Sequence, residues 1–181
     1  ARQGGAGQGA GRDGLRRLYS RDDLERLEVI VTLRELEVSL TSIRTLMALV
    51  DAEGLDNVRV WDGDAGFLLP RLPDASIAIV SLLYPDPWPK RRQRKRRFVS
   101  DDSLREITRI LKLGGEFRFA SDIDDYVGWT LARGVRCPGL RWRAQHADDW
   151  RRPWQGWPGT RYEAKALREG RTPSYLTFER I

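Results

Sequence analysis

The chain has 181 residues, enough for one domain with a hydrophobic core. Hydrophobic residues make up 40% of it, but no run approaches the roughly 18–20 apolar residues that a membrane helix needs, so composition argues against a membrane-spanning protein. Cys137 is the only cysteine, which excludes a disulfide scaffold and favours a cytoplasmic protein. The formal net charge of +6 favours a polyanionic partner.

Residues 1–26 differ in composition from the rest of the chain. Residues 1–14 contain six glycines and few large apolar side chains, which is typical of a linker or a disordered segment. Residues 15–26 are dense in charge, and their leucines are loosely spaced. We therefore expect an atypical Gly/Arg-rich segment over residues 1–26 and a folded domain over residues 27–181.

From residue 28 onward, strand patterns alternate with helix patterns. The predicted strands are 28–32, 57–61, 76–84, 116–120 and 174–178, and the second is followed by the turn-forming residues 62–65. The predicted helices are 40–52, 123–133 and one that is capped by Asp101 or Asp102 and ends at Gly114–Gly115. Residues 141–158 are predicted as a Trp-rich loop. This alternation predicts an α/β domain with a mostly parallel sheet, in which 76–84 is a central strand.

The loop after strand 76–84 carries the most specific pattern. It reads Tyr84-Pro-Asp-Pro-Trp-Pro-Lys90, and seven of the eight residues from Lys90 to Arg97 are basic. Ligands of open α/β sheets bind at the carboxyl ends of strands, and the prolines stiffen this loop. The loop can therefore hold Asp86 and Trp88 in one geometry, in which Trp88 stacks on a base. The basic run can bind phosphates. The alternative is a solvated charged loop or a patch that resembles a localisation signal.

Three other sites have both a functional and a structural interpretation, and a fourth has a functional one. Asp64 can accept hydrogen bonds from an adenine amino group or can cap the following helix, and Glu37 can grip a ribose or can be a solvated carboxylate at a helix start. Asp122 follows strand 116–120, where capping competes with ligand binding. The segment Thr160-Arg-Tyr-Glu163 can read a base edge and a phosphate. His146 has no Cys or His partner at metal-ligand spacing, so we expect no metal.

Taken together, these motifs resemble the bacterial tRNA (guanine-N7)-methyltransferases over about residues 37–181. The motifs are Tyr84–Lys90, Lys95-Arg-Arg-Phe-Val99, Gly114-Gly-Glu-Phe-Arg-Phe-Ala-Ser-Asp122 and Thr160–Glu163. The resemblance implies a Rossmann-like class I methyltransferase fold with S-adenosylmethionine as methyl donor. It also implies guanosine 46 of tRNA as acceptor, in a cytoplasmic monomer that needs neither a metal nor a membrane.

The resemblance also assigns roles residue by residue. Asp86 matches the aspartate taken as catalytic, and Glu37, Asp64 and Asp86 match cofactor-binding positions. The substrate-binding positions are Lys90, Asp122, Thr160, Arg161, Tyr162 and Glu163. The RNA contacts are Arg92, Gln93, Arg94, Lys95, Arg96 and Arg97, with Gln93 and Arg94 standing where the family commonly has histidines.

One segment departs from the family pattern. Where the family has an acidic residue and a Gly-rich cofactor turn, this chain has residues 12–18, of which only Gly14 fits. A frame-shifted N-terminal segment is one hypothesis, because codons permitted for residues 12–17 can encode such a turn when read one nucleotide later. The alternative function is therefore a tRNA-binding module whose cofactor loop is damaged.

Overall fold

The computed structural model describes residues 48, 50, 52–54, 58, 59, 61 and 63–181. The atypical segment 1–26 and the predicted strand 28–32 lie outside these residues. Of the predicted strand 57–61, residues 58, 59 and 61 are described, and none of the three is in a strand, so that prediction was wrong for them. Of the predicted helix 40–52, residues 48, 50 and 52 are described, and all three are helical.

A four-stranded sheet forms the centre of the described region. Its strands are β1 (Ile77–Leu83), β2 (Leu111–Ser121), β3 (Leu140–Trp142) and β4 (Ser174–Arg180), in the order β1-β2-β4-β3. β1 pairs parallel with β2, and β4 pairs antiparallel with both β2 and β3. Three strands therefore run in one direction with β4 against them. The described sheet is mixed rather than mostly parallel, because two of its three pairings are antiparallel, and with its flanking helices it agrees with the predicted Rossmann-like α/β fold.

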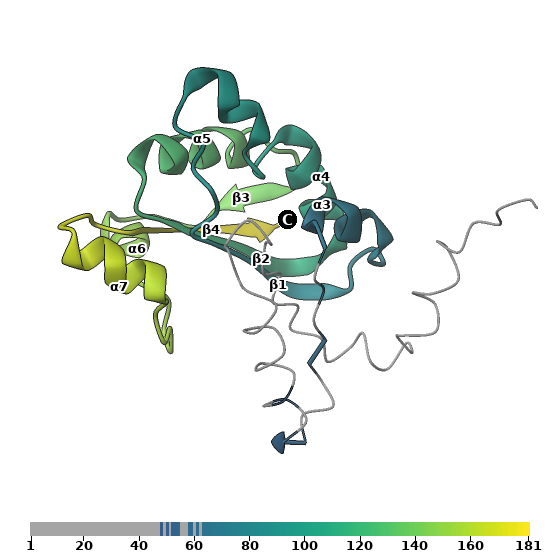
Figure 1. Cartoon of the computed structure of the whole chain (residues 1–181). Coiled ribbons are helices and arrows are strands. Elements are labelled where there is room, and N and C mark those ends of the chain that lie inside the picture. Colours follow the sequence, from purple (N-terminus) through teal and green to yellow (C-terminus); the bar gives the residue numbers. More distant parts are fainter. Residues whose placement is uncertain (1–47, 49, 51, 55–57, 60, 62) are drawn as a thin grey trace, which may run out of the picture.

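Helices cover the sheet and one of its ends. α4 (Asp101–Ile110) and α5 (Asp124–Gly134) lie over one face, whereas α6 (Asp148–Arg151) and α7 (Arg161–Arg168) lie at the end where β4 begins (Figure 1). The short helices are α3 (Ala65–Leu68) and the 3-10 helices η1 (Leu69–Arg71) and η2 (Arg91–Arg96). The carboxyl ends of β1 and β2 meet the start of β4 at one edge, because Ser121 pairs with Ser174.

The core lies between α4, α5 and the sheet. Leu104, Ile107 and Ile110 recur at helical spacing on α4 and are fully buried, as are the alternating Phe117 and Phe119 of β2. Burying a side chain of this size contributes roughly 1.5–3 kcal/mol. This packing fixes the edge of the sheet from which the loops project.

The boundary between α4 and β2 differs from the sequence prediction. The N-cap is Ser100, whose side chain accepts from the backbone N–H of Ser103 in a capping box, and not Asp101 or Asp102. The helix ends at Ile110, and the glycines lie inside β2 as a bulge, where Gly114 has φ 75°. A Cβ on Gly115 would lie 2.8 Å from the Lys112 carbonyl oxygen, so only glycine fits.

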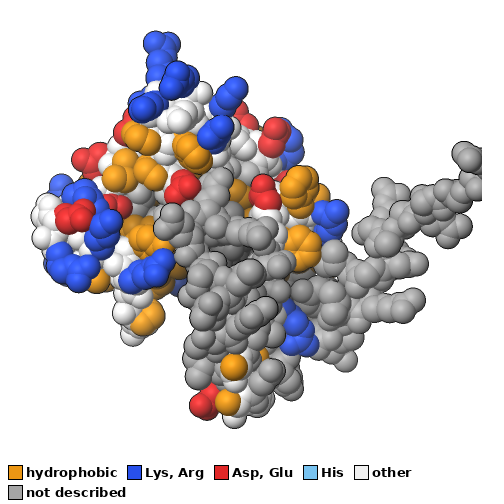
Figure 2. Space-filling model, in the orientation of Figure 1, with side chains coloured by type: hydrophobic (Ala, Val, Ile, Leu, Met, Phe, Trp, Pro, Cys, Tyr) orange, Lys and Arg blue, Asp and Glu red, His pale blue; other side chains and the backbone are white. Residues whose placement is uncertain are grey.

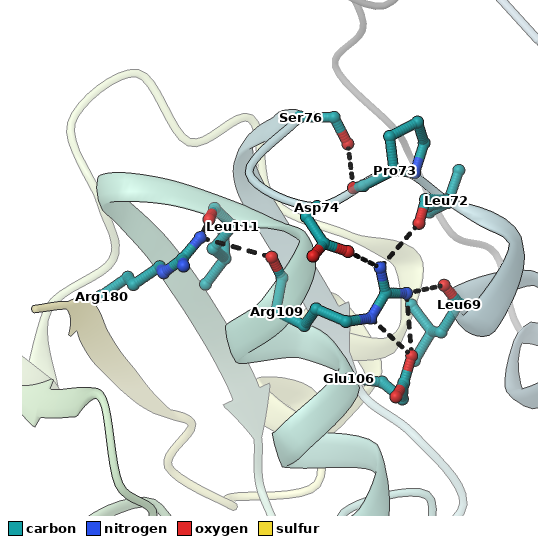
Figure 3. A network of polar contacts seen from close by, with 9 residues as sticks. All are labelled: Leu69, Leu72, Pro73, Asp74, Ser76, Glu106, Arg109, Leu111 and Arg180. Carbon is teal, nitrogen blue, oxygen red and sulfur yellow. Dashed lines mark hydrogen bonds and ion pairs between the residues drawn. The ribbon is translucent and has the colours of Figure 1, made fainter.

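A single arginine ties α4 to the segment before β1. The Arg109 guanidinium donates to the carbonyl oxygens of Leu72 and Leu69, both at 2.9 Å, and pairs with Asp74 and Glu106 (Figure 3). Four acceptors use the fixed geometry of one guanidinium. Arg109 therefore orients the entry to β1, whose observed bounds agree with the predicted strand.

The C-terminal third is more regular than predicted. The Trp-rich region 141–158 begins within β3 and contains α6, so its prediction as a loop was partly wrong. α5 and β4 match the predicted helix 123–133 and the predicted strand 174–178. α7 was not predicted, although Thr160-x-x-Glu163 is a helix-start signature, and the Thr160 hydroxyl does accept from the Glu163 N–H at 3.1 Å.

Candidate functional site

The loop that follows β1 has an unusual backbone. Tyr84 and Trp88 have φ values of 49° and 40°, a region that bulky residues rarely adopt. The Tyr84 N–H donates to the Ala120 carbonyl oxygen at 2.8 Å, so the loop starts against the end of β2. Strained residues of this kind cluster at ligand-binding sites, where the surrounding structure holds them in place.

Asp86 lies within this loop and is half-buried. Among the described residues, no hydrogen bond or ion pair engages its carboxylate. The indole N–H of Trp88 is buried and finds no acceptor in the same part of the chain, and the Arg96 guanidinium lies 4.8 Å from the centre of the Trp88 ring. Because buried polar groups are costly without partners, this loop presents groups that a ligand can satisfy.

Arg97 anchors the loop from beneath. Its side chain is fully buried; Nε donates to the Pro87 carbonyl oxygen at 2.7 Å, and Nη2 pairs with the Asp125 carboxylate. The guanidinium also lies 4.8 Å and 5.0 Å from the ring centres of Tyr126 and Trp129. Because its charge is enclosed by protein, Arg97 has a structural role in this loop, and its expected contact with RNA stays an untested prediction.

The rest of the basic run forms η2 and its N-cap, Lys90. The side chains of Lys90, Arg92, Lys95 and Arg96 are exposed, and Gln93 is half-buried. Arg94 donates to the other Asp125 oxygen at 2.7 Å, so Asp125 joins η2 to the start of α5. Hydrogen bonding from Arg97 lowers the pKa of the Asp125 carboxyl below its usual range. The exposed cations remain available for phosphates.

The predicted substrate residues after β2 and at α7 are engaged within the protein. Asp122 pairs with Arg171 at 2.5 Å, and its side chain is 12% exposed. Glu163 is buried; its Oε1 accepts from the Tyr175 hydroxyl and its Oε2 from the Trp157 indole, both at 2.6 Å. These two bonds hold the Glu163 carboxylate in one orientation, and the Thr160 cap fixes the backbone of the same residue.

Two tyrosines complete the environment of Glu163. Burial raises the pKa values of the Tyr84 and Tyr175 phenols, and the nearby Glu163 raises them further, so both stay protonated at neutral pH. The Tyr84 hydroxyl is buried beside this pair, and both Tyr175 and Glu163 act on it. Neither tyrosine was a candidate in the sequence, since a tyrosine in or beside a strand is ordinarily read as core.

Three segments that are distant in sequence converge at this edge of the sheet. Tyr84, Ala120 and Tyr175 form one buried cluster, against which Trp154, Trp157 and Tyr162 pack. Asp86, Asp122 and Glu163 are thus carried by elements that share one edge. Arg161 is exposed and donates to the Tyr162 hydroxyl at 2.8 Å. Among the described residues the Asp86 carboxylate has no partner, whereas those of Asp122 and Glu163 are held by hydrogen bonds, and exposed cations lie on the neighbouring elements.

The two other predicted cofactor residues are Glu37 and Asp64. Glu37 lies outside the described residues. Asp64 caps α3, accepting from the Gly66 N–H at 2.7 Å through Oδ1, so the structural interpretation of Asp64 is confirmed and its second oxygen is unused among the described residues. No set of three or more His, Cys, Asp or Glu side chains in the described ranges is arranged to hold a metal ion. None of the described helices is both long and apolar enough to span a membrane.

Comparison with known proteins supports these motifs. The family model described as Putative methyltransferase matches residues 32–175. A second model, described as MerR HTH family regulatory protein, matches residues 1–49 and thus less than half of the chain.

Curated relatives match at high identity. A tRNA (guanine-N(7)-)-methyltransferase of Azorhizobium caulinodans is 57% identical over 132 residues, which cover 73% of this chain and 57% of that protein. A protein of the same description from Agrobacterium fabrum is 55% identical, over 80% of this chain and 62% of its own length. The chain thus spans about 60% of the length of these relatives. Among solved structures, an rRNA methylase from Streptococcus thermophilus has a TM-score of 0.47 at 11% identity, over 80% of this chain and 70% of that one.

Proposed function

Since this chain belongs to the family described as Putative methyltransferase, we propose that it transfers a methyl group from S-adenosylmethionine to N7 of a guanosine in tRNA. The acceptor in this proposal is guanosine 46, and the protein acts as a cytoplasmic monomer. The observation that carries the proposal is Asp86, a half-buried carboxylate without a partner among the described residues, at the carboxyl end of β1. The relatives of the same printed function support it.

The described residues fit a cofactor that carries positive charge and hydrogen-bonding groups. Asp86 and the unused oxygen of Asp64 are the carboxylates that would hold it, with Glu37 as a third that lies outside the described residues. The indole N–H of Trp88, buried and without a partner among the described residues, is a donor that such a ligand would satisfy, which supports the proposal. When bound, S-adenosylmethionine supplies an electrophilic methyl group.

The reaction asks for orientation rather than proton removal. Guanine N7 carries a free lone pair, so the N7–C bond can form as the S–C bond breaks, without a base. The Asp86 carboxylate would hold the N–H edge of the guanine and offset the positive charge that develops on the ring. Lys90, Asp122 and the segment Thr160–Glu163 would position the base and its backbone, and Arg92, Arg94, Lys95 and Arg96 would contact the RNA beside Gln93.

The rival function is a tRNA-binding module without methyl transfer. The observation that favours it is the sequence of residues 12–18, in which only Gly14 matches the family's cofactor turn. This rival predicts that the chain binds tRNA through the same basic residues and does not turn over. The domain division into residues 1–26 and 27–181 remains part of either proposal.

One assay separates the two functions. Labelled methyl transfer from S-adenosylmethionine to unmodified tRNA is measured, with tRNA containing 7-deazaguanosine at position 46 as the control. We expect incorporation that the control abolishes. Binding of tRNA without incorporation would refute the enzyme and support the binding module, and sequencing the DNA across codons 10–36 would then test the frame-shift hypothesis.

A further inference from the structure

The exposed side of α7 carries three cations in register. Arg161, Lys165 and Arg168 are spaced i, i+4 and i+7, which places them within one narrow face of a helix. All three are exposed, whereas Glu163 and Ala166 on the opposite face are buried. The orientation of α7 is therefore fixed by its buried face, and its cationic face points to solvent.

These charges are not neutralised within the described region. Glu163 is the only acid within α7, and its carboxylate is buried against Tyr175 and Trp157. Glu169, just after the helix, pairs with Arg171. Lys165 and Arg168 have no ion pair with any residue that the structure describes. A solvated charged face usually carries acids as well as bases, so an uncompensated row of cations favours a polyanionic ligand.

The position of α7 gives the row a place relative to the candidate site. α7 begins at Thr160 and holds Glu163 at the same edge as Tyr84, which opens the loop leading to η2. Figure 2 shows Lys and Arg side chains gathered at the top of the molecule, over the segment containing η2, and again at the left, over α7. The loop that carries Asp86 runs from Tyr84, against whose cluster Tyr162 of α7 packs, to Lys90 at the start of η2, so the candidate site connects the two basic elements.

We propose that the Arg161–Lys165–Arg168 face of α7 binds the RNA phosphodiester backbone on the side of the site opposite to η2. This inference rests on the proposed tRNA substrate and adds a second contact surface to it. The seven residue steps from Arg161 to Arg168 extend about 10.5 Å along the helix, which is long enough for more than one phosphate contact. An RNA backbone that is bound on both sides of the site would hold the base between the two contacts close to Asp86.

The test uses the full chain and avoids Arg161, which has a proposed role in the site. In the double variant Lys165→Ala/Arg168→Ala, two cations are removed. The matched control Arg105→Ala/Arg136→Ala removes two other exposed cations, one on α4 and one after α5. The charge-preserving double variant Lys165→Arg/Arg168→Lys checks for rescue, and circular dichroism melts check folding.

The readout is the dissociation constant for unmodified tRNA between 50 and 200 mM salt. We expect the slope of log affinity against log salt to fall by about two in the alanine variant and affinity to drop roughly 10- to 100-fold. The control and the charge-preserving variant should retain the parental slope. In methyl transfer, KM for tRNA should rise by a similar factor while kcat changes less than twofold.

Several outcomes are decisive. An alanine variant whose slope matches that of the Arg105/Arg136 control would overturn the proposal. Equal weakening toward heparin and tRNA with an unchanged KM would also overturn it, since the surface would then be a general polyanion site. If the parental chain binds tRNA but transfers no methyl group, and the alanine variant shows the predicted change in slope, the inference stands and the proposed enzymatic function fails.

Discussion

Replacement of Arg97 by methionine tests the claim that this residue belongs to the fold and not to the RNA surface. The change removes a guanidinium that bonds to the Pro87 carbonyl oxygen and to Asp125 while keeping an apolar chain against Tyr126 and Trp129. The matched variant is Arg94→Met, because Arg94 bonds to the other oxygen of the same carboxylate but has a side chain that is 36% exposed.

We expect Arg97→Met to lower the free energy of unfolding more than Arg94→Met does. Removing one partner of a buried charged pair costs about 3–5 kcal/mol. Asp125 is 45% exposed and can be solvated after the change, so we expect the lower end of this range for Arg97→Met. An exposed ion pair contributes about 0–1 kcal/mol, which is the expectation for Arg94→Met. At roughly 2–4 °C per kcal/mol for a chain of this size, Arg97→Met should lower Tm by about 6–12 °C.

Urea unfolding and thermal melts measure both variants, and methyl transfer at a permissive temperature reports on the loop. Arg97→Met should lower kcat because Pro87, next to Asp86, loses its anchor, whereas Arg94→Met should weaken tRNA binding at low salt and leave kcat unchanged. The reasoning is refuted if the two variants differ by less than 1 kcal/mol in unfolding free energy, or if Arg97→Met changes only the salt dependence of tRNA binding.

Three further changes test other parts of the structure. Asp86→Asn should lower kcat at least 100-fold with Tm unchanged, since the carboxylate has no described partner to lose; equal loss of stability and activity would contradict its role. The lowered pKa of Asp125 means that its stabilisation is fully present above about pH 4 and is lost as pH falls through the lowered value, so acid should destabilise the parent more than Asp125→Asn. Gly134→Ala should cost about 1–3 kcal/mol in chemical denaturation, because a Cβ there would overlap the Phe178 ring; a neutral result would show that the ring can move.

Several features of this protein followed from sequence because they depend on local pattern. The apolar run 76–84 predicted β1 through its length and composition, and the helix predicted after Asp101 or Asp102 is α4, whose Leu104, Ile107 and Ile110 recur at helical spacing. The order of the proline-rich loop, its basic tail and Thr160–Glu163 indicated the family that the comparisons support. The helix and strand boundaries were less accurate near Gly114–Gly115, because a glycine pair ends helices and also forms bulges.

Tertiary structure decided which charged residues are available to a ligand. In the sequence Arg97 is one cation among seven, and only the packing of Tyr126, Trp129 and Asp125 around it shows that its charge is enclosed. Glu163 likewise reads as a free carboxylate until the strand pairing places Tyr175 against it. Burial and hydrogen bonding join residues that are far apart in the chain. A linear pattern can therefore name these residue types but cannot say which of them are buried and paired within the fold.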